Sequence, residues 1–372
     1  MIDPGRSDVK LVRIDPDIRL ERATFGSAEW VATKLGEMTG LRLNELLLDC
    51  LLASRSPAVP EDIVKKVVLR HPEAAVDDIR QLIRELLDRG YLTGDPSRGR
   101  RAQSSSAWEE LGWTHARDYH VQTFGYPFLE YDERGRSVED GVRMRHNASE
   151  RADTDRTLRR DDANGGREIR PSSEDAALCA DTRGSLGAGG RRAPFTLGRL
   201  MKMLAVGTVK TGTHPLPFNG SEPLLRKTSP SGGGRHPTET YIHLDGIVGT
   251  DPGWHHVDHY GGVLERLPMD VAPRHWCPVP DNCGVAYFLF TSRFYRNRYR
   301  YREPRTFRTV HMDVGHLLAT IELLANSLGL EAYPDHLGDE AVAVGRVLEL
   351  DPLIEWPLAG LSVFGEMEGH GA

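Results

Sequence analysis

The sequence has few cysteines, and none of them forms a pair typical of a metal or redox site. Its four cysteines are Cys50, Cys179, Cys277 and Cys283. No CxxC pair is present, which excludes the zinc-ribbon and thioredoxin-like signatures. Cys277 and Cys283 flank a proline-rich turn, but reduced thiols are the usual state inside cells. We therefore expect neither a disulfide nor a metal site.

Long apolar runs and an excess of positive charge are also missing. No stretch approaches the length needed to cross a bilayer, and MIDPGRSDVKLVRIDPD at the N-terminus lacks the apolar run of a signal peptide. The chain has 47 Lys and Arg against 54 Asp and Glu, a net charge of -7, which gives no reason to expect nucleic-acid binding. We expect a cytoplasmic protein without a membrane or nucleic-acid partner.

The chain is long enough, at 372 residues, for two domains. Residues 9–15 are typical of a strand, and residues 41–54, 61–71 and 76–94 carry apolar residues at helical spacing. Short helices followed by a turn into a strand resemble a winged helix. We interpret residues 1–100 as a winged-helix-like peptide-docking module, since a peptide can add a strand to an exposed sheet edge. A purely structural appendage is the alternative.

Residues 132–182 differ in composition from the rest of the chain. They are dense in Arg and Asp and almost free of large apolar residues. Such a stretch cannot bury enough apolar surface to offset the entropy lost on ordering. We expect a charged flexible insertion.

Globular patterns return in residues 183–372. Helical spacing marks 194–207 and 311–330, and strand-like patterns mark 238–249, 285–294 and 356–366, with a hairpin expected at 252–267. Helices and strands are interspersed without repeating βαβ units, which favours the α+β class.

A glycine-rich turn, SPSGGGRHP, spans residues 229–237. Three successive glycines let the backbone pass close to a flat ligand and present N–H groups to it. The spacing is neither that of a Walker loop nor that of a dinucleotide-binding helix start.

Three segments resemble one enzyme family. RKTSPSGGGRHPTETYI is similar to the PSGGxRHPxExY stretch of SagB-type thiazole/oxazole dehydrogenases, a branch of the nitroreductase-fold FMN family. Residues 312–330 resemble that family's DAGH helix, and the resemblance continues through 339–365. Residues 113–124 resemble the start of the same domain. We therefore expect the flavin domain to begin within 101–131 and to resume at 183–372.

The resemblance implies an FMN held at the interface of a homodimer. The residues that it implies for cofactor binding are Arg183, Ser185, Ser229, Pro230, Ser231, Gly232, Gly233, Arg305 and His316. Arg183-Gly184-Ser185 is the nearest match to the family's phosphate-binding residues, and a guanidinium suits a phosphate. The alternative is that these arginines only belong to the charged segment.

The family's general base is a Lys-Tyr pair ahead of the long helix. Aligning Arg305 and Arg308 with the family's two arginines places Tyr301 and Arg302 at the positions of that pair. Arginine is a poor base. The catalytic candidates are therefore Tyr301, Tyr299 and Arg302, with either tyrosine acting as acid or base if neighbouring arginines lower the pKa of the phenol.

Other polar residues receive less specific interpretations. His255, His256 and His259 have the spacing of metal ligands, but they lie in an expected hairpin without an apparent carboxylate partner. Surface or turn histidines are favoured there. Asp313 is a candidate to orient a neighbouring arginine.

The resemblance implies FMN-dependent oxidation of peptidyl thiazolines or oxazolines to azoles in a modified precursor peptide. Because the Lys-Tyr pair is missing, two alternatives stay open. One is flavin-dependent reduction of dehydroalanine or dehydrobutyrine in a peptide. The other is a flavin-free scaffold for a cyclodehydratase, which is also a candidate partner of the enzyme.

Overall fold

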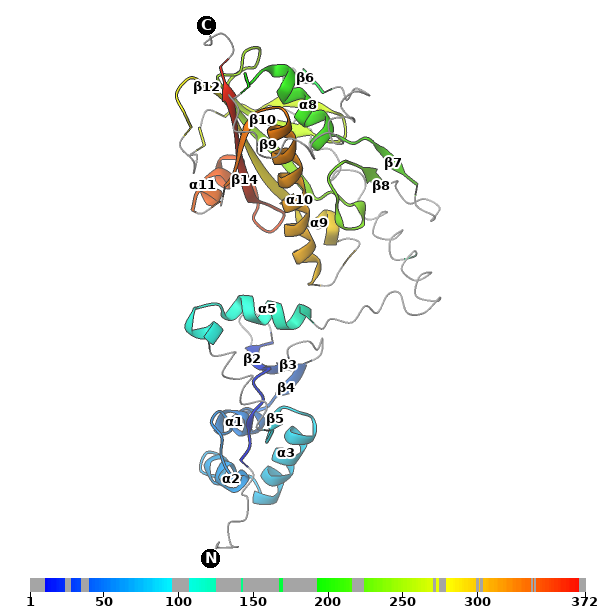
Figure 1. Ribbon diagram of the computed structural model, residues 1–372. Coiled ribbons are helices and arrows are strands. Elements are labelled where there is room, and N and C mark those ends of the chain that lie inside the picture. The colour runs from blue at the N-terminus through cyan, green and yellow to red at the C-terminus, as the bar shows by residue number, and fades with distance from the viewer. Residues whose placement is uncertain are drawn as a thin grey trace, which may run out of the picture. The chain divides into compact units, whose positions relative to one another are not determined.

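A computed structural model describes residues 11–23, 28–34, 40–95, 107–124, 142, 167–169, 193–215, 224–269, 272–273, 279–298, 301, 304–335, 337 and 339–367. The chain divides into two compact units, residues 1–127 and residues 128–372 (Figure 1). Each unit has its own hydrophobic core.

The first unit combines short strands with α-helices. Its elements are β1 (Arg13–Ile14), β2 (Ile18–Arg22), β3 (Trp30–Lys34), β4 (Gly40–Leu43), α1 (Glu45–Ala53), α2 (Pro60–Val68), α3 (Val76–Asp88), β5 (Leu92–Thr93) and α5 (Thr114–Phe124). Strands β2, β3 and β4 form an antiparallel sheet in that order, and β1 pairs with β5.

Local signals explain where the helices of this unit begin. The Asn44 side chain accepts a hydrogen bond from the Leu47 N–H at 2.8 Å, so α1 begins after an N-cap. Pro60 opens α2, where a missing N–H costs nothing. The three expected helices are present. Residues 41–43 belong to β4, however, because strand pairing with β3 outweighs their helical spacing.

Helix α5 contacts the sheet of the first unit. Arg19 on β2 donates two hydrogen bonds to the Asp118 carboxylate, at 2.9 and 2.8 Å. The described part of residues 101–131, expected from the sequence to begin the flavin domain, therefore lies in the first unit.

The second unit is built on a seven-stranded antiparallel sheet with the order β13-β14-β12-β9-β10-β11-β6. Its strands are β6 (Arg167–Glu168), β9 (Thr238–Asp245), β10 (Gly253–Asp258), β11 (Val263–Arg266), β12 (Cys283–Arg293), β13 (Glu331–Asp335) and β14 (Glu355–Glu366), and β7 (Gly212–His214) pairs separately with β8 (Leu224–Arg226). Its helices are α8 (Leu197–Gly207), α9 (Phe294–Arg298), α10 (Thr306–Ser327) and α11 (Asp339–Val347), with a 3₁₀ turn, η2, at Gly232–Gly234.

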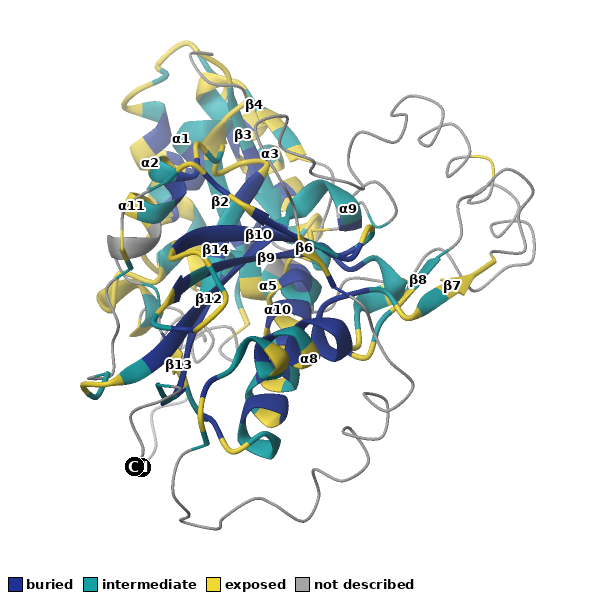
Figure 2. Cartoon of the chain, turned by 90° about the horizontal axis from the view of Figure 1, so that it is seen from above, coloured by how far each residue is buried: buried dark blue, intermediate teal, exposed yellow. Residues whose placement is uncertain are grey.

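The central strands of this sheet are buried on both faces (Figure 2). Phe288 and Phe290 on β12 point into the large core with α8 and α10, while Tyr287 and Leu289 point into a second cluster that includes Leu348. This alternation follows from the two-residue period of a strand. Burying each phenylalanine contributes roughly 1.5–3 kcal/mol.

The strands, the hairpin and the long helix that the sequence predicts within residues 238–366 are present, as β9, β10–β11, β12, α10 and β14. The predicted α+β class is therefore confirmed. Within the segment expected to be flexible, Arg167–Glu168 form β6 and Ile169 is buried in the core; its other residues, Val142 apart, lie outside the described ranges. No helix in the described ranges is long and apolar enough to span a bilayer.

Candidate functional site

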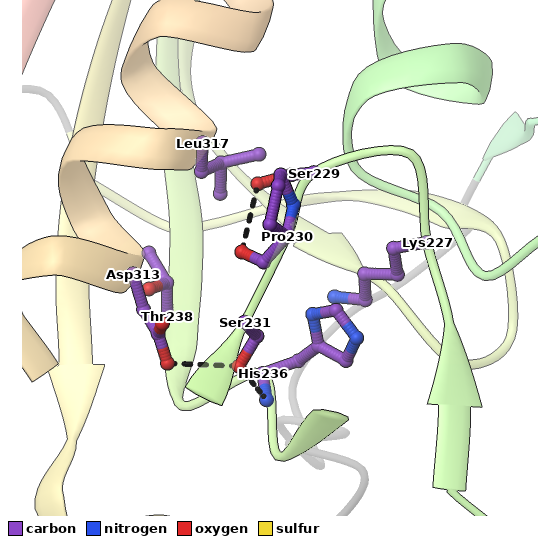
Figure 3. A pocket seen from close by; sticks show the side chains of 8 residues that line it. All are labelled: Lys227, Ser229, Pro230, Ser231, His236, Thr238, Asp313 and Leu317. Atoms are coloured by element: carbon purple, nitrogen blue, oxygen red, sulfur yellow. Dashed lines mark hydrogen bonds between the residues drawn. The ribbon is translucent and has the colours of Figure 1, made fainter. Parts of the chain in front are cut away.

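The glycine-rich turn is attached to helix α10 through one buried carboxylate. Asp313 accepts a hydrogen bond from the Ser231 hydroxyl at 2.8 Å (Figure 3). It accepts another from the Gly232 N–H at 2.9 Å. The Ser231 oxygen in turn accepts the His236 N–H at 2.8 Å. Burial raises the pKa of Asp313 although these hydrogen bonds oppose the shift. Asp313 therefore orients the turn.

The glycines of the turn are required by contacts within the chain. A Cβ on Gly232 would overlap the Thr309 side chain, and a Cβ on Gly233 would overlap the Tyr301 hydroxyl. Gly233 also has a φ of 61°, a left-handed conformation that side chains disfavour. The turn consequently brings Tyr301 against Gly233, two of the residues singled out in the sequence.

A small pocket lies beside the turn. It is lined by Lys227, Ser229, Pro230, Ser231, His236, Thr238, Asp313 and Leu317 (Figure 3). The Thr238 hydroxyl is buried and has no hydrogen-bond partner among the described residues. Because buried polar atoms normally find a partner, this hydroxyl marks a place for a ligand or water.

His236 lines the same pocket as a neutral ring. Its Nε2 lies 3.2 Å from the Leu225 carbonyl, to which it donates. Burial, reinforced by the nearby Lys227, lowers the pKa of His236 to about 3. Its φ of 47° is unusual for a residue other than glycine, and such strain concentrates at functional sites.

Of the remaining site residues predicted from the sequence, the structure describes Arg305 and His316. Arg305 precedes the first turn of α10, and His316 lies one turn after Asp313 with its buried Nδ1 unpartnered among the described residues. Arg183, Ser185, Tyr299 and Arg302 lie outside the described residues.

The three histidines were interpreted as surface or turn residues, and His259 does lie in the turn after β10, but none of the three lies on the surface. His255, His256 and His259 are 5, 1 and 6% exposed. The His256 ring lies 2.9 Å from the Glu239 carboxylate, and its other nitrogen lies 3.7 Å from Glu265. The carboxylate partner was not apparent in the sequence because Glu239 is brought near by the β9–β10 pairing.

A buried ionic network thus lies beneath the pocket. Glu239 bonds to Arg296 and His256, and these partners lower its pKa against the effect of burial. Burial alone lowers the pKa of His256, but its hydrogen bond to Glu239 and the nearby Glu265 carboxylate prevail and raise it to about 9. Across the described ranges, no group of three or more His, Cys, Asp or Glu is arranged to hold a metal ion.

Lys227 is the residue of this network that sequence reasoning missed. Its amine lies 2.6 Å from the Nδ1 of His259, and burial lowers its pKa to about 7. Its position two residues before Ser229 is a weak signal, because nothing in the local pattern indicates that the amine is enclosed.

Residues 255–366 match the model of the nitroreductase family. The matched range covers β10 to β14 and includes Asp313, whereas the glycine-rich turn precedes it.

Two curated proteins are similar in sequence. The trifolitoxin-processing protein TfxB of Rhizobium leguminosarum bv. trifolii is 32% identical over 202 residues, which cover 50% of this chain and 52% of that protein. The second is a protein of Methanocaldococcus jannaschii that carries the provisional name nitroreductase MJ1384. It is 30% identical over 108 residues, which cover 28% of this chain and 54% of that protein. The chain spans about half the length of each.

Among solved structures, a chain of the E. coli microcin synthetase McbBCD complex with truncated pro-MccB17 bound is 17% identical. The match covers 68% of this chain and 91% of that one, with a TM-score of 0.35. Within the second unit, residues 255–366 are thus similar to the nitroreductase family.

Proposed function

We propose that this chain is an FMN-dependent oxidoreductase that oxidises peptidyl thiazolines or oxazolines to azoles. The observation that carries the proposal is the turn fastened to α10 by Asp313, beside a pocket with an unpartnered Thr238 hydroxyl, in a unit similar to the nitroreductase family.

The donors at the pocket fit a flavin. A flavin ring has one edge of nitrogen and carbonyl groups, and the pocket offers the Thr238 hydroxyl beside the apolar Pro230 and Leu317. Ser229, Gly233 and His316 would complete the contacts on this chain, because the Ser231 and Gly232 donors are already bound to Asp313. When it is bound, FMN supplies a ring that can accept a hydride.

The substrate class rests on sequence similarity. TfxB, 32% identical over half of this chain, is named for processing trifolitoxin. Together with the SagB-like motifs, this similarity supports a modified precursor peptide as the substrate. A homodimer would supply the second wall of the flavin site, and a cyclodehydratase would supply the azoline.

The first unit provides a surface suited to hold such a peptide. In the described part of the chain, no strand pairs with the outer edge of β4. The other edge strand, β2, is approached by α5 through the Arg19–Asp118 ion pair. An extended peptide can add to an open edge such as that of β4 through main-chain hydrogen bonds.

Reduction of a dehydroamino acid is the second candidate. The Tyr301 hydroxyl lies against Gly233 of the turn, and a neutral phenol is a proton donor. Reduction would use that proton on the α-carbon after hydride addition to the β-carbon. Oxidation instead requires a residue that accepts a proton.

The first experiment is the visible absorption spectrum of the purified protein, with the released chromophore compared against FMN. We expect FMN. Peptide mass then separates the reactions: loss of a hydrogen pair supports the oxidase, and gain of a pair with a nicotinamide reductant supports the reductase. A colourless protein that does not take up FMN would contradict both and favour the scaffold.

A further inference from the structure

The pocket beside the turn contains one amine whose pKa its surroundings lower to about 7. Lys227 follows β8, and although the residue as a whole is half-buried, its amine lies among buried groups. The ionisable groups around it are His236, Glu239, Asp258, His259, Arg296 and Asp313.

The Glu239 carboxylate near Lys227 already has cationic partners, so it does not need the Lys227 ammonium group. Glu239 bonds to both Arg296 and His256, the second of which is held protonated. A charged Lys227 would place a third cation near this carboxylate. Burial therefore prevails over the attraction of Glu239 and Asp258, and it lowers the pKa of Lys227 to about 7.

His259 can accommodate both protonation states of Lys227. Its Nδ1 lies 2.6 Å from the amine and 3.2 Å from the Thr208 carbonyl, and its Nε2 lies 3.8 Å from Glu239. When Lys227 is an ammonium, it donates to the Nδ1 lone pair, and the ring carries its proton on Nε2, toward Glu239. When Lys227 is neutral, the ring carries the proton on Nδ1 and donates it to Thr208.

We infer that Lys227 is the proton acceptor of the oxidation, with His259 as its positioning partner. This role rests on the proposed function. The lone pair of the amine forms an N–H bond with the proton on one ring carbon of the azoline. The electron pair of the broken C–H bond becomes the new ring double bond, and FMN, when bound, would accept the hydride from the neighbouring carbon. Dioxygen would then take the two electrons and two protons as hydrogen peroxide.

This inference explains how the chain manages without the Lys-Tyr pair. At that position Arg302 cannot release a proton, whereas Lys227 reaches the turn from a different segment. The proposed role predicts that oxidation becomes faster as pH rises through about 7, because the amine accepts a proton only in its neutral form.

The first test needs neither flavin nor substrate. Protein with isotope-labelled lysines is titrated by NMR without FMN, and the Lys227 signal is identified by its loss in Lys227→Met. We expect a midpoint near 7, shifted in His259→Asn. A midpoint near the ordinary lysine value of about 10.4 would overturn the inference.

The second test compares single-turnover rates of azoline peptide oxidation. Lys227→Met and Lys227→Arg should retain FMN but react at least about 100-fold more slowly, without the pH dependence near 7. Lys202→Met, which removes an exposed lysine on α8, should keep the full rate. If Lys227→Met reacts at the wild-type rate, this role is refuted while the proposed function stands. If the wild type neither binds FMN nor changes peptide mass, the proposed function fails, and the role fails with it.

Discussion

Single side chains organise the site of the second unit. Asp313 is buried on α10 and satisfies both the Ser231 hydroxyl and the Gly232 N–H. Buried carboxylates are costly unless their oxygens accept hydrogen bonds. The contact therefore fixes the turn relative to the long helix.

Asp313→Ala should loosen the turn. Its two donors lose their acceptor, so we expect a loss of about 1–3 kcal/mol in unfolding free energy and a lower FMN content. Denaturant unfolding and flavin absorbance measure these effects. Glu322→Ala, on the same helix, is the control and should change neither. If Asp313→Ala were as stable as the wild type, the turn would keep its conformation without the Asp313 hydrogen bonds.

Gly233→Ala tests the contact between the turn and Tyr301. The new Cβ would overlap the Tyr301 hydroxyl in addition to the strain of a positive φ, which alone costs about 1–2 kcal/mol. Gly249→Ala has the same kind of φ, but its Cβ would make only an ordinary 3.4 Å contact with Leu197. Calorimetry should show the larger destabilisation at Gly233. Equal values would mean that Tyr301 moves away without cost.

At the scale of elements, the open edge of β4 in the first unit is the feature that bears on peptide binding. Strand β4 runs directly into α1 through the Asn44 cap, so its position is determined by the helix that follows. Its outer edge has no paired strand in the described ranges. An open edge next to a rigid helix is a suitable platform for an extended peptide.

Addition of a precursor peptide should therefore protect β4 from hydrogen exchange. We expect the amides of residues 40–43 to exchange about tenfold more slowly, because the added strand accepts their hydrogen bonds. Mass spectrometry of the full chain measures this, with a scrambled peptide as the control. Protection confined to residues 18–22 would place the peptide on β2 instead.

For the whole molecule, the exposed face of α10 is the main candidate for self-association. Met312 and Leu323 are 59 and 45% exposed, and their spacing of eleven residues places them on one side of the helix. Exposed apolar residues aligned in this way favour a protein contact. This face agrees with the proposed homodimer.

Leu323→Lys should weaken that dimer. Placing a charge in an apolar interface should raise the dimer dissociation constant at least about tenfold, equivalent to about 1.4 kcal/mol. Sedimentation equilibrium provides the measurement. Val248→Lys changes an exposed apolar residue in a turn and should have no effect. A monomeric wild type, or equal behaviour of the two variants, would count against α10 as the interface.

The amino-acid sequence by itself determined the elements whose patterns are long and regular. The apolar run of β12, the helical spacing of α10 and the turn at residues 229–237 were all predicted, because each leaves a distinct local pattern in the sequence. The short strands β2 and β3 were not predicted, since they owe their structure to pairing rather than to local pattern.

Only the tertiary structure decided the chemistry beneath the turn. Lys227, Glu239 and His259 come from three different segments and become neighbours through the pairing of β9 with β10 and the return of the chain after β8. Their charges depend on burial, which no single segment determines. The pKa of a lysine that appears ordinary in the sequence thus falls to about 7, because burial disfavours its charged form and Glu239 is already paired with other cations.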